Sequence, residues 1–134
     1  MLDSFDHMPR PMEVLSICHD ILKPGGIIVV KVHDISSLFA KVSGKRYYAL
    51  IPPSHLSYFS PYTIVDALKK TGFTPITLKY ISHILFFKTI FYRLSRQNTR
   101  SLSWNIYMML NNIPLGNLKF KKNMFDIMTV VATA

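Results

Sequence analysis

The chain has 134 residues, a length that suits one domain. Hydrophobic residues make up 49% and charged residues 17% of the sequence, a composition that excludes a disordered tail. Sixteen Lys and Arg stand against seven Asp and Glu, and the net charge of +9 favours anionic partners without selecting one. The single cysteine excludes an internal disulfide and a four-cysteine zinc site, so we expect a cytoplasmic protein.

The first 33 residues predict a helix followed by a strand. From Met12 to Leu22 polar residues recur every three or four positions opposite an apolar side, which is typical of an amphipathic helix. Pro24, Gly25 and Gly26 end this helix, because proline cannot continue the ladder and glycine tolerates positive φ. The β-branched run Ile27–His33 predicts a strand apolar on both sides, as in a parallel sheet with helices on both faces.

The middle of the chain reads as a long loop, a helix and a strand. Residues 34–59 contain Pro52-Pro53 and favour a loop with one helical turn over 37–42. Ser60 is a predicted N-cap for a helix that starts at Pro61 and ends at Gly72. Alternation over 74–81 then predicts a strand.

Residues 82–112 are helical in pattern. An aromatic and aliphatic arc runs from Ile84 to Leu94, and a second helix is expected over 102–110. The lysines over 119–122 predict a basic turn, and residues 125–134 a final strand. The apolar stretch 80–92 is shorter than the roughly 20 residues that a bilayer span needs, and residues 1–11 do not look like a secretory signal.

Sequence spacing alone gives few signs of catalysis. The five histidines do not pair at metal-ligand spacings, so we expect no metal site. No G-x-S-x-G elbow occurs. The Gly25-Gly26 pair is better explained as a helix end than as a cofactor loop.

Three motifs resemble those of a known family. Phe5-Asp6-His7-Met8-Pro9, Leu22-Lys23-Pro24-Gly25-Gly26-Ile27 and the segment from Pro52 to Phe73 resemble, in order, motifs of class I S-adenosylmethionine-dependent methyltransferases. The match is to the methyltransferase 23, UbiG-like group, and it covers Met1 to about Leu78. It implies an enzyme that methylates a small-molecule acceptor with S-adenosylmethionine as cofactor.

The resemblance also implies a fold. We expect an α/β chain that corresponds to the C-terminal half of a Rossmann-like sheet, with strands 5, 7 and 6, a remnant of strand 4 and flanking helices. Residues 1–134 would form a single partial methyltransferase domain with a helical insertion at about 82–112. No G-x-G-x-G loop occurs in the sequence. A glycine turn and an acidic residue hold a nucleotide-like cofactor in such folds, so we expect the chain to need a missing N-terminal half and to be inactive alone.

The resemblance supplies the candidate site residues. Leu2 and Asp3 align near the methionine part of the cofactor, although Asp3 is equally well explained as a solvated acid. His55, as catalytic base, together with His7, Tyr58 and Phe59, would bind the acceptor, because a neutral imidazole can take the proton of an acceptor hydroxyl. The structural alternatives are that His7 caps a helix, His55 bonds within its loop and Phe59 packs beside the Ser60 cap.

A second reading is a non-enzymatic basic module. Residues 84–100 combine an apolar arc with a cationic face made of Lys88, Arg93, Arg96 and Arg100. Such a helix could pack on the sheet, cover a substrate or lie on an anionic membrane or acidic protein, which would make the protein membrane-peripheral. No nucleic-acid partner is expected, because no RNA-binding motif occurs.

Overall fold

The computed structural model describes residues 1–95 and 98–134, with side chains except those of residues 83, 85, 93, 120 and 122. The chain divides into two compact units. The first, here called the sheet unit, comprises Met1–Ile81 and Met124–Ala134. The second, here called the helical unit, comprises Ser82–Asn123, so the predicted insertion at 82–112 lies within a unit of its own.

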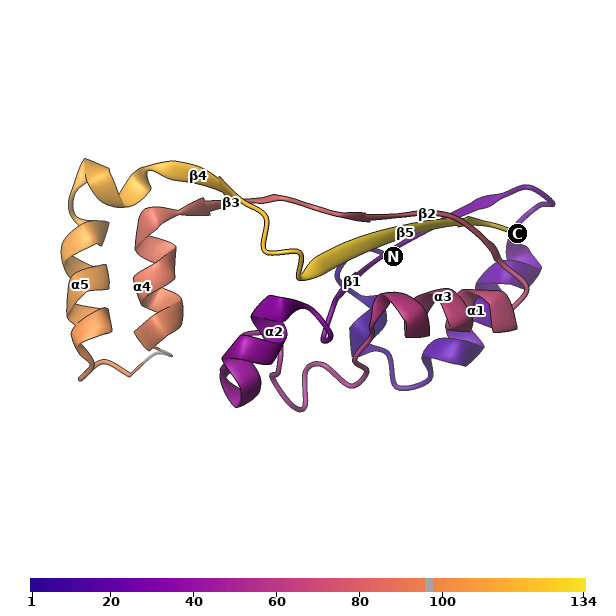
Figure 1. Cartoon of the computed structure of the whole chain (residues 1–134), viewed down its shortest axis with the longest axis horizontal. Coiled ribbons are helices and arrows are strands. Elements are labelled where there is room, and N and C mark those ends of the chain that lie inside the picture. Colours follow the sequence, from indigo (N-terminus) through magenta and orange to yellow (C-terminus); the bar gives the residue numbers. More distant parts are fainter. Residues whose placement is uncertain (96–97) are drawn as a thin grey trace. The chain divides into compact units, whose positions relative to one another are not determined.

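A three-stranded sheet organises the sheet unit (Figure 1). Its strands are β1 (Ile27–His33), β2 (Thr74–Tyr80) and β5 (Ile127–Thr133), in the order β1-β5-β2. The last strand in the chain is therefore the central one, and it is antiparallel to both neighbours. As a result β1 and β2 run in the same direction and end at the same edge of the sheet.

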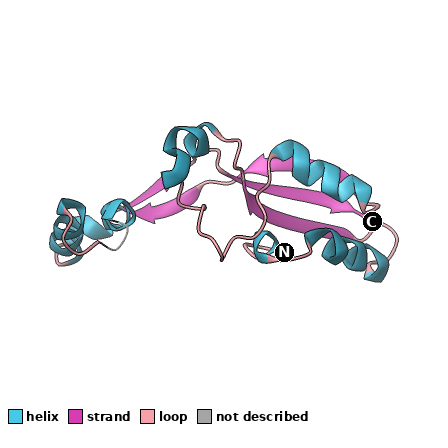
Figure 2. Ribbon diagram, turned by 90° about the horizontal axis from the view of Figure 1, so that it is seen from below, coloured by secondary structure: helices cyan, strands magenta, loops and turns pink. Residues whose placement is uncertain are grey.

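Two helices cover one face of this sheet. They are α1 (Pro11–Ile21) and α3 (Pro61–Lys70), which both lie below the sheet in Figure 1. Figure 2 views the sheet from this side, with strands visible in the gap between the two helices. The core lies under these helices, where alternate strand residues meet the helix stripes. Its fully buried members include Leu15, Val30, Ile64, Leu68, Met128 and Val130.

The predicted strand at Ile27–His33 has the expected bounds, but the expectation that both of its faces are buried is wrong. It pairs antiparallel with β5 along its length and forms one parallel bridge, between Lys31 and Leu2. Val30 is fully buried on the helix-covered face, while Ile27 is 60% and Val29 36% exposed on the other. An apolar run shows that a strand forms without showing which of its faces other elements cover.

Helix α3 begins and ends as its sequence predicts. Ser60 forms a capping box with Thr63, in which each side chain satisfies a backbone N–H at the helix start. At the other end Gly72 has φ +93°, and the Phe73 N–H donates to the Leu68 carbonyl at 2.9 Å. This is a Schellman ending, which turns the chain directly into β2.

Gly72 gives a test of this ending. A Cβ added there would lie 2.8 Å from Nε2 of His19, on top of the cost of positive φ. We expect Gly72→Ala to lower the free energy of unfolding by about 2 kcal/mol, as measured by urea denaturation. Gly25→Ala is the matched control, since Gly25 has φ +77° but open space around its Cα, and should cost only about 1 kcal/mol. Equal losses would show that the contact with His19 is unimportant.

The segment between β1 and α3 is largely irregular. It holds α2 (Leu38–Ser43), where the sequence predicts a helical turn, and the 3-10 turn Gly44–Arg46. A small second core of Ala40, Tyr47 and Ala49 anchors it. A further 3-10 turn, Phe5–His7, precedes α1 and brings Phe5 into the main core.

The helical unit is an antiparallel pair of short strands that carries two helices. Strands β3 (His83–Phe86) and β4 (Lys119–Lys122) pair together, and α4 (Phe87–Ser95), α5 (Leu102–Asn111) and the 3-10 turn Pro114–Asn117 lie between them. The predicted second helix is confirmed. The predicted helix over 82–86 and the predicted turn over 119–122 are wrong, because these segments form strands. Four residues are too few to distinguish a strand from a helix by periodicity.

Candidate functional site

The site residues gather where β1 and β2 end. In open α/β sheets, ligands bind beside the carboxyl ends of the strands. His33 is the last residue of β1 and Asp34 follows it, while Tyr80 is the last residue of β2. The Tyr80 hydroxyl donates to Oδ2 of Asp34 at 2.8 Å, which ties the two strand ends together.

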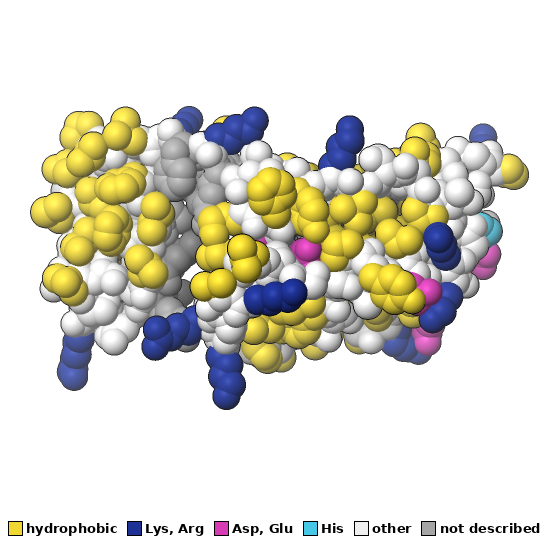
Figure 3. Space-filling model, in the orientation of Figure 1, with side chains coloured by type: hydrophobic (Ala, Val, Ile, Leu, Met, Phe, Trp, Pro, Cys, Tyr) yellow, Lys and Arg dark blue, Asp and Glu magenta, His cyan; other side chains and the backbone are white. Residues whose placement is uncertain are grey.

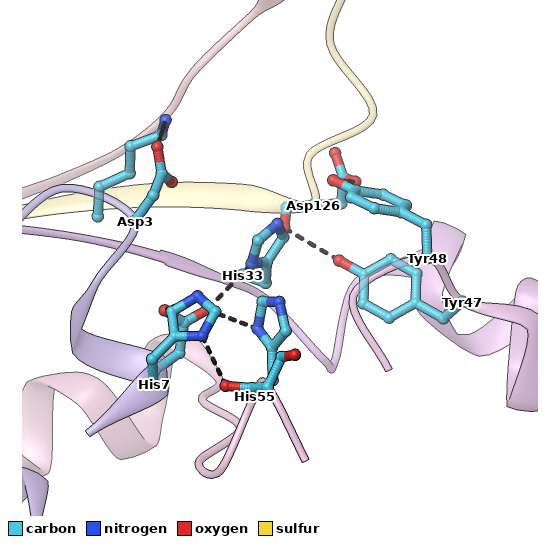
Figure 4. A network of polar contacts seen from close by, with 10 residues as sticks. Asp3, His7, His33, Tyr47, Tyr48, His55 and Asp126 are labelled. Atoms are coloured by element: carbon cyan, nitrogen blue, oxygen red, sulfur yellow. Dashed lines mark hydrogen bonds and ion pairs between the residues drawn. The ribbon is translucent and has the colours of Figure 1, made fainter. Parts of the chain in front are cut away.

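A buried carboxylate, Asp6, lies at the centre of a histidine cluster (Figure 4). Asp6 belongs to the 3-10 turn before α1 and is only 2% exposed. Its Oδ2 accepts hydrogen bonds from Nδ1 of His33 at 3.2 Å and from Nδ1 of His55 at 3.0 Å. The chain thus brings together a turn, a strand end and a loop that lie far apart in the sequence.

His7 completes the cluster. Its Nδ1 lies 2.6 Å from the Ser54 carbonyl oxygen, and its Nε2 lies 3.7 Å from Oδ1 of Asp6. The ring of His55 lies between the other two rings, 4.3 Å from that of His7 and 5.3 Å from that of His33. Three imidazoles therefore surround one carboxylate.

The surroundings keep Asp6 ionised. Burial raises the pKa of its carboxyl, but the hydrogen bond from His33, a backbone hydrogen bond and the charges of His55 and His33 together outweigh it. The net result is a pKa below the ordinary value of 3.8. Asp6 is thus a buried anion that can fix the tautomers of His33 and His55.

A second polar network holds the loop beside the cluster. Asp34 is 2% exposed, and its Oδ1 accepts from the backbone N–H and the hydroxyl of Ser36. Tyr48 donates to Oδ2 of Asp126 at 2.7 Å, and its ring lies edge-on to His33. These contacts fix the 34–48 segment at the same sheet edge.

Tyr80 gives a test of this network. Its burial and its hydrogen bond to Asp34 raise the pKa of the hydroxyl from 10.0 to about 12. The protonated form is thus favoured in the folded state, so this contribution to stability is complete below pH 10 and is lost as the pH rises toward 12. In an absorbance titration of phenolate, Tyr80→Phe should remove a residue that ionises near pH 12. Loss of a residue ionising near pH 10 instead would contradict the bond to Asp34.

The residues predicted to contact the cofactor lie beside β1. Leu2 forms a parallel bridge with Lys31 and is 64% exposed. Asp3 has φ 52°, and its Oδ2 accepts from Nζ of Lys31 at 2.6 Å. Their contact with a cofactor stays a prediction.

The four residues predicted to bind the acceptor lie in different surroundings in the structure. His7 and His55 enter the cluster, and Tyr58 is 37% exposed. Phe59 is buried in the core with its ring 5.1 Å from that of Phe5, which favours the packing alternative, and its contact with an acceptor stays a prediction. It follows the pattern of an apolar residue before a helix cap.

Sequence reasoning missed the two residues that link the cluster, Asp6 and His33. Asp6 carries no catalytic pattern of its own, and the sequence around His33 predicts only the end of an apolar strand. Its position at the carboxyl end of that strand is the signal that could have identified it. The spacing of the histidines also gave no sign that Asp6, His7 and His55 can each offer one ligand atom within 4.8 Å of the others.

Comparisons with known proteins identify the family of the chain. The sequence profile of a methyltransferase domain family matches residues 1–78, more than half of the chain, so the chain belongs to this family. No curated protein matches the sequence significantly.

Two solved structures share the fold. One is a S-adenosylmethionine-dependent methyltransferase from Thermotoga maritima, described as a possible histamine N-methyltransferase, with 18% identity and a TM-score of 0.56 over 99% of this chain and 53% of that one. The other is a putative methyltransferase from Bacillus halodurans, with 14% identity and a TM-score of 0.55 over 97% of this chain and 60% of that one. The chain thus spans a little over half the length of these proteins.

Proposed function

We propose that the chain forms the acceptor side of a S-adenosylmethionine-dependent methyltransferase that acts on a small molecule. The observation that carries this proposal is the histidine cluster around Asp6 at the carboxyl edge of β1. The edge is where folds of this class place their ligands, and the cluster joins a base to a buried carboxylate that orients it.

The sheet supports a correspondence with part of a larger one. The order β1-β5-β2, with β5 antiparallel in the centre, matches strands 5, 7 and 6 of class I methyltransferases. The parallel bridge between Leu2 and Lys31 is then the end of strand 4. Under this correspondence the 3-10 turn with Asp6 and His7 follows strand 4.

We assign the proton-accepting role to His55. Its Nδ1–H donates to Asp6, so in the neutral ring Nε2 carries the lone pair. An acceptor hydroxyl or amine would give its proton to Nε2 as its oxygen or nitrogen bonds to the methyl carbon and the sulfur–carbon bond breaks. S-adenosylmethionine, when bound, supplies an electrophilic methyl group, so alignment and proton removal are what the protein adds.

The residues present fit the cofactor only in part. Asp3 and Leu2 would lie along its methionine portion, but the Asp3 carboxylate is engaged by Lys31. The sequence has no G-x-G-x-G loop to hold the nucleotide portion. We therefore propose that cofactor affinity requires elements outside these 134 residues.

Nitrogen NMR of the imidazole rings tests the acceptor site. We would titrate the chain with a panel of small phenols, catechols and amines. We expect a member of the panel to shift the signals of His55 and His7 and not that of His19, which lies on α1 away from the strand ends. His55→Gln should abolish the response. If no member shifts the cluster, or if His19 responds equally, the proposed function is contradicted.

A second proposal concerns the helical unit. Figure 3 shows apolar side chains gathered on the visible face of this unit. Its exposed apolar residues include Leu94, Leu102, Met108, Met109, Leu115 and Leu118. The strand residues Lys119 and Lys121 add positive charge. We propose that this unit lies on an anionic membrane surface.

Only part of the cationic face predicted from the sequence can be described in the structure. Lys88 donates to Asn111 at 2.9 Å, and Arg100 is exposed. Arg96 and the side chain of Arg93 lie outside the described part of the chain. No helix in residues 1–95 and 98–134 has the length and apolar character needed to cross a bilayer. Flotation with liposomes should show binding that depends on anionic lipid, and equal flotation with neutral lipid would contradict an anionic preference.

A further inference from the structure

The cluster around Asp6 contains an unsatisfied contact. Asp6 Oδ1 is buried and has no hydrogen-bond partner among the described residues. Nε2 of His7 lies 3.7 Å from this oxygen, beyond hydrogen-bond distance. A buried carboxylate oxygen without a partner destabilises the fold. We therefore expect a bound cation or donor, other than the described side chains, to contact this oxygen.

The tautomer of His7 makes this contact more specific. The Ser54 oxygen is a carbonyl and can only accept, so Nδ1 of His7 must carry the hydrogen in their 2.6 Å bond. In the neutral ring, Nε2 therefore presents its lone pair toward Oδ1 of Asp6. Two lone pairs that face each other repel unless a cation, either a proton or a metal ion, lies between them.

We propose that Asp6, His7 and His55 bind a divalent first-row transition metal ion. The three residues each offer one ligand atom, and these atoms lie within 4.8 Å of one another. Two imidazoles and one carboxylate form a donor set suited to Zn²⁺ or Fe²⁺, with positions left for water or another oxygen ligand.

The ligand atoms lie close to the separations that a metal ion sets. Bonds of about 2.1 Å place neighbouring ligand atoms about 3–3.5 Å apart. The 3.7 Å between Asp6 Oδ1 and His7 Nε2 is slightly longer than this. All three ligand atoms lie within 4.8 Å of one another, so a bound ion would draw them together.

Supporting contacts of the kind found around metal ligands are present. Histidine ligands commonly donate their second N–H to a backbone carbonyl, as His7 does to Ser54. His33 donates to Oδ2 of Asp6 and is a positioning residue, since it holds the carboxylate and is not itself one of the three ligands. The hydrogen bond from His33 to Oδ2 can thus remain in place while Oδ1 binds the ion.

Metal binding does not rest on methyl transfer. If the ion binds Nδ1 of His55, the hydrogen of the neutral ring moves to Nε2, and the bond to the ion replaces the hydrogen bond to Asp6. The base role given above to His55 applies to the metal-free protein.

The test uses the 134-residue chain without a polyhistidine tag. Titration with Co²⁺ should produce visible absorption bands that saturate at one ion per chain, and Zn²⁺ should displace them. His7→Gln and His55→Gln should weaken binding by at least tenfold, and His33→Gln by about tenfold through the carboxylate it positions. His19→Gln, a histidine outside the cluster, is the matched control and should leave binding unchanged.

Two results would overturn the proposal. One is the absence of saturable Co²⁺ bands in the unaltered chain, which would show that a proton on His7 satisfies Asp6. The other is unchanged affinity in His7→Gln. The His7 side chain is partly exposed, so this substitution should not prevent folding. Because these readouts are of binding, a failed acceptor titration leaves their outcome unaffected, and the two proposals can fail separately.

Discussion

Phe5→Ala is expected to lower the free energy of unfolding of the sheet unit by about 4 kcal/mol. The Phe5 side chain is fully buried, and its ring lies 5.1 Å from that of Phe59 in a stacked arrangement. Truncation removes the transfer free energy of the ring and leaves a cavity that the rigid sheet cannot close. Urea denaturation followed by circular dichroism measures the loss.

The same change should also disturb the cluster. Phe5 is the neighbour of Asp6 in the 3-10 turn Phe5–His7, so its burial fixes the depth of the carboxylate. Tyr62→Ala is the matched control, since Tyr62 is 79% exposed on α3 and should change stability by no more than about 0.5 kcal/mol. Similar losses in both variants would contradict the position of Phe5 in the core.

Asp6→Ala is expected to cost about 3 kcal/mol at neutral pH. The substitution leaves the Nδ1–H groups of His33 and His55 without their acceptor in a part-buried environment. Each unsatisfied donor carries a desolvation penalty, and the two add to the loss. Urea denaturation at pH 7 measures the effect. Asp66→Ala is the control, because Asp66 pairs with Lys70 on the surface of α3 and should cost little.

The pH dependence of this loss has a definite sign. The folded-state pKa of Asp6 is lowered from 3.8, so its contribution is present above pH 3.8 and is lost as the pH falls through the folded-state value. The difference between the unaltered chain and Asp6→Ala should thus shrink as the pH falls below 3.8. A difference that stays constant down to pH 2 would show that folding does not lower the pKa of Asp6.

Local chemistry made much of the sheet unit predictable. The bounds of β1 follow from a β-branched run between Gly26 and the polar residues after His33, and α3 follows from its Ser60 cap and Gly72 ending. These signals lie within a few residues of the elements that they determine. The pairing of β1 with β5 joins segments about 100 positions apart. The resemblance to methyltransferases predicts these strands as neighbours, but the local pattern of either segment does not.

The site shows the same division. His7 and His55 could be chosen because they lie in motifs shared with methyltransferases. Asp6 lies in the same motif as His7, but its contacts with His33 and His55 could not be predicted from it. Asp6, His33 and His55 meet only after the sheet has formed, and their separations in the sequence follow no local period. Short β3 and β4 were missed for a related reason, since their pairing with each other determines their structure.

The central claim is that these residues form the acceptor side of a methyltransferase site but only part of its cofactor-binding site. Calorimetric titration of the 134-residue chain with S-adenosylhomocysteine tests it most directly. The claim predicts no saturable heat at micromolar ligand, because the sequence has no glycine loop for the nucleotide and Asp3 is engaged by Lys31. One molecule bound per chain with micromolar affinity would contradict it.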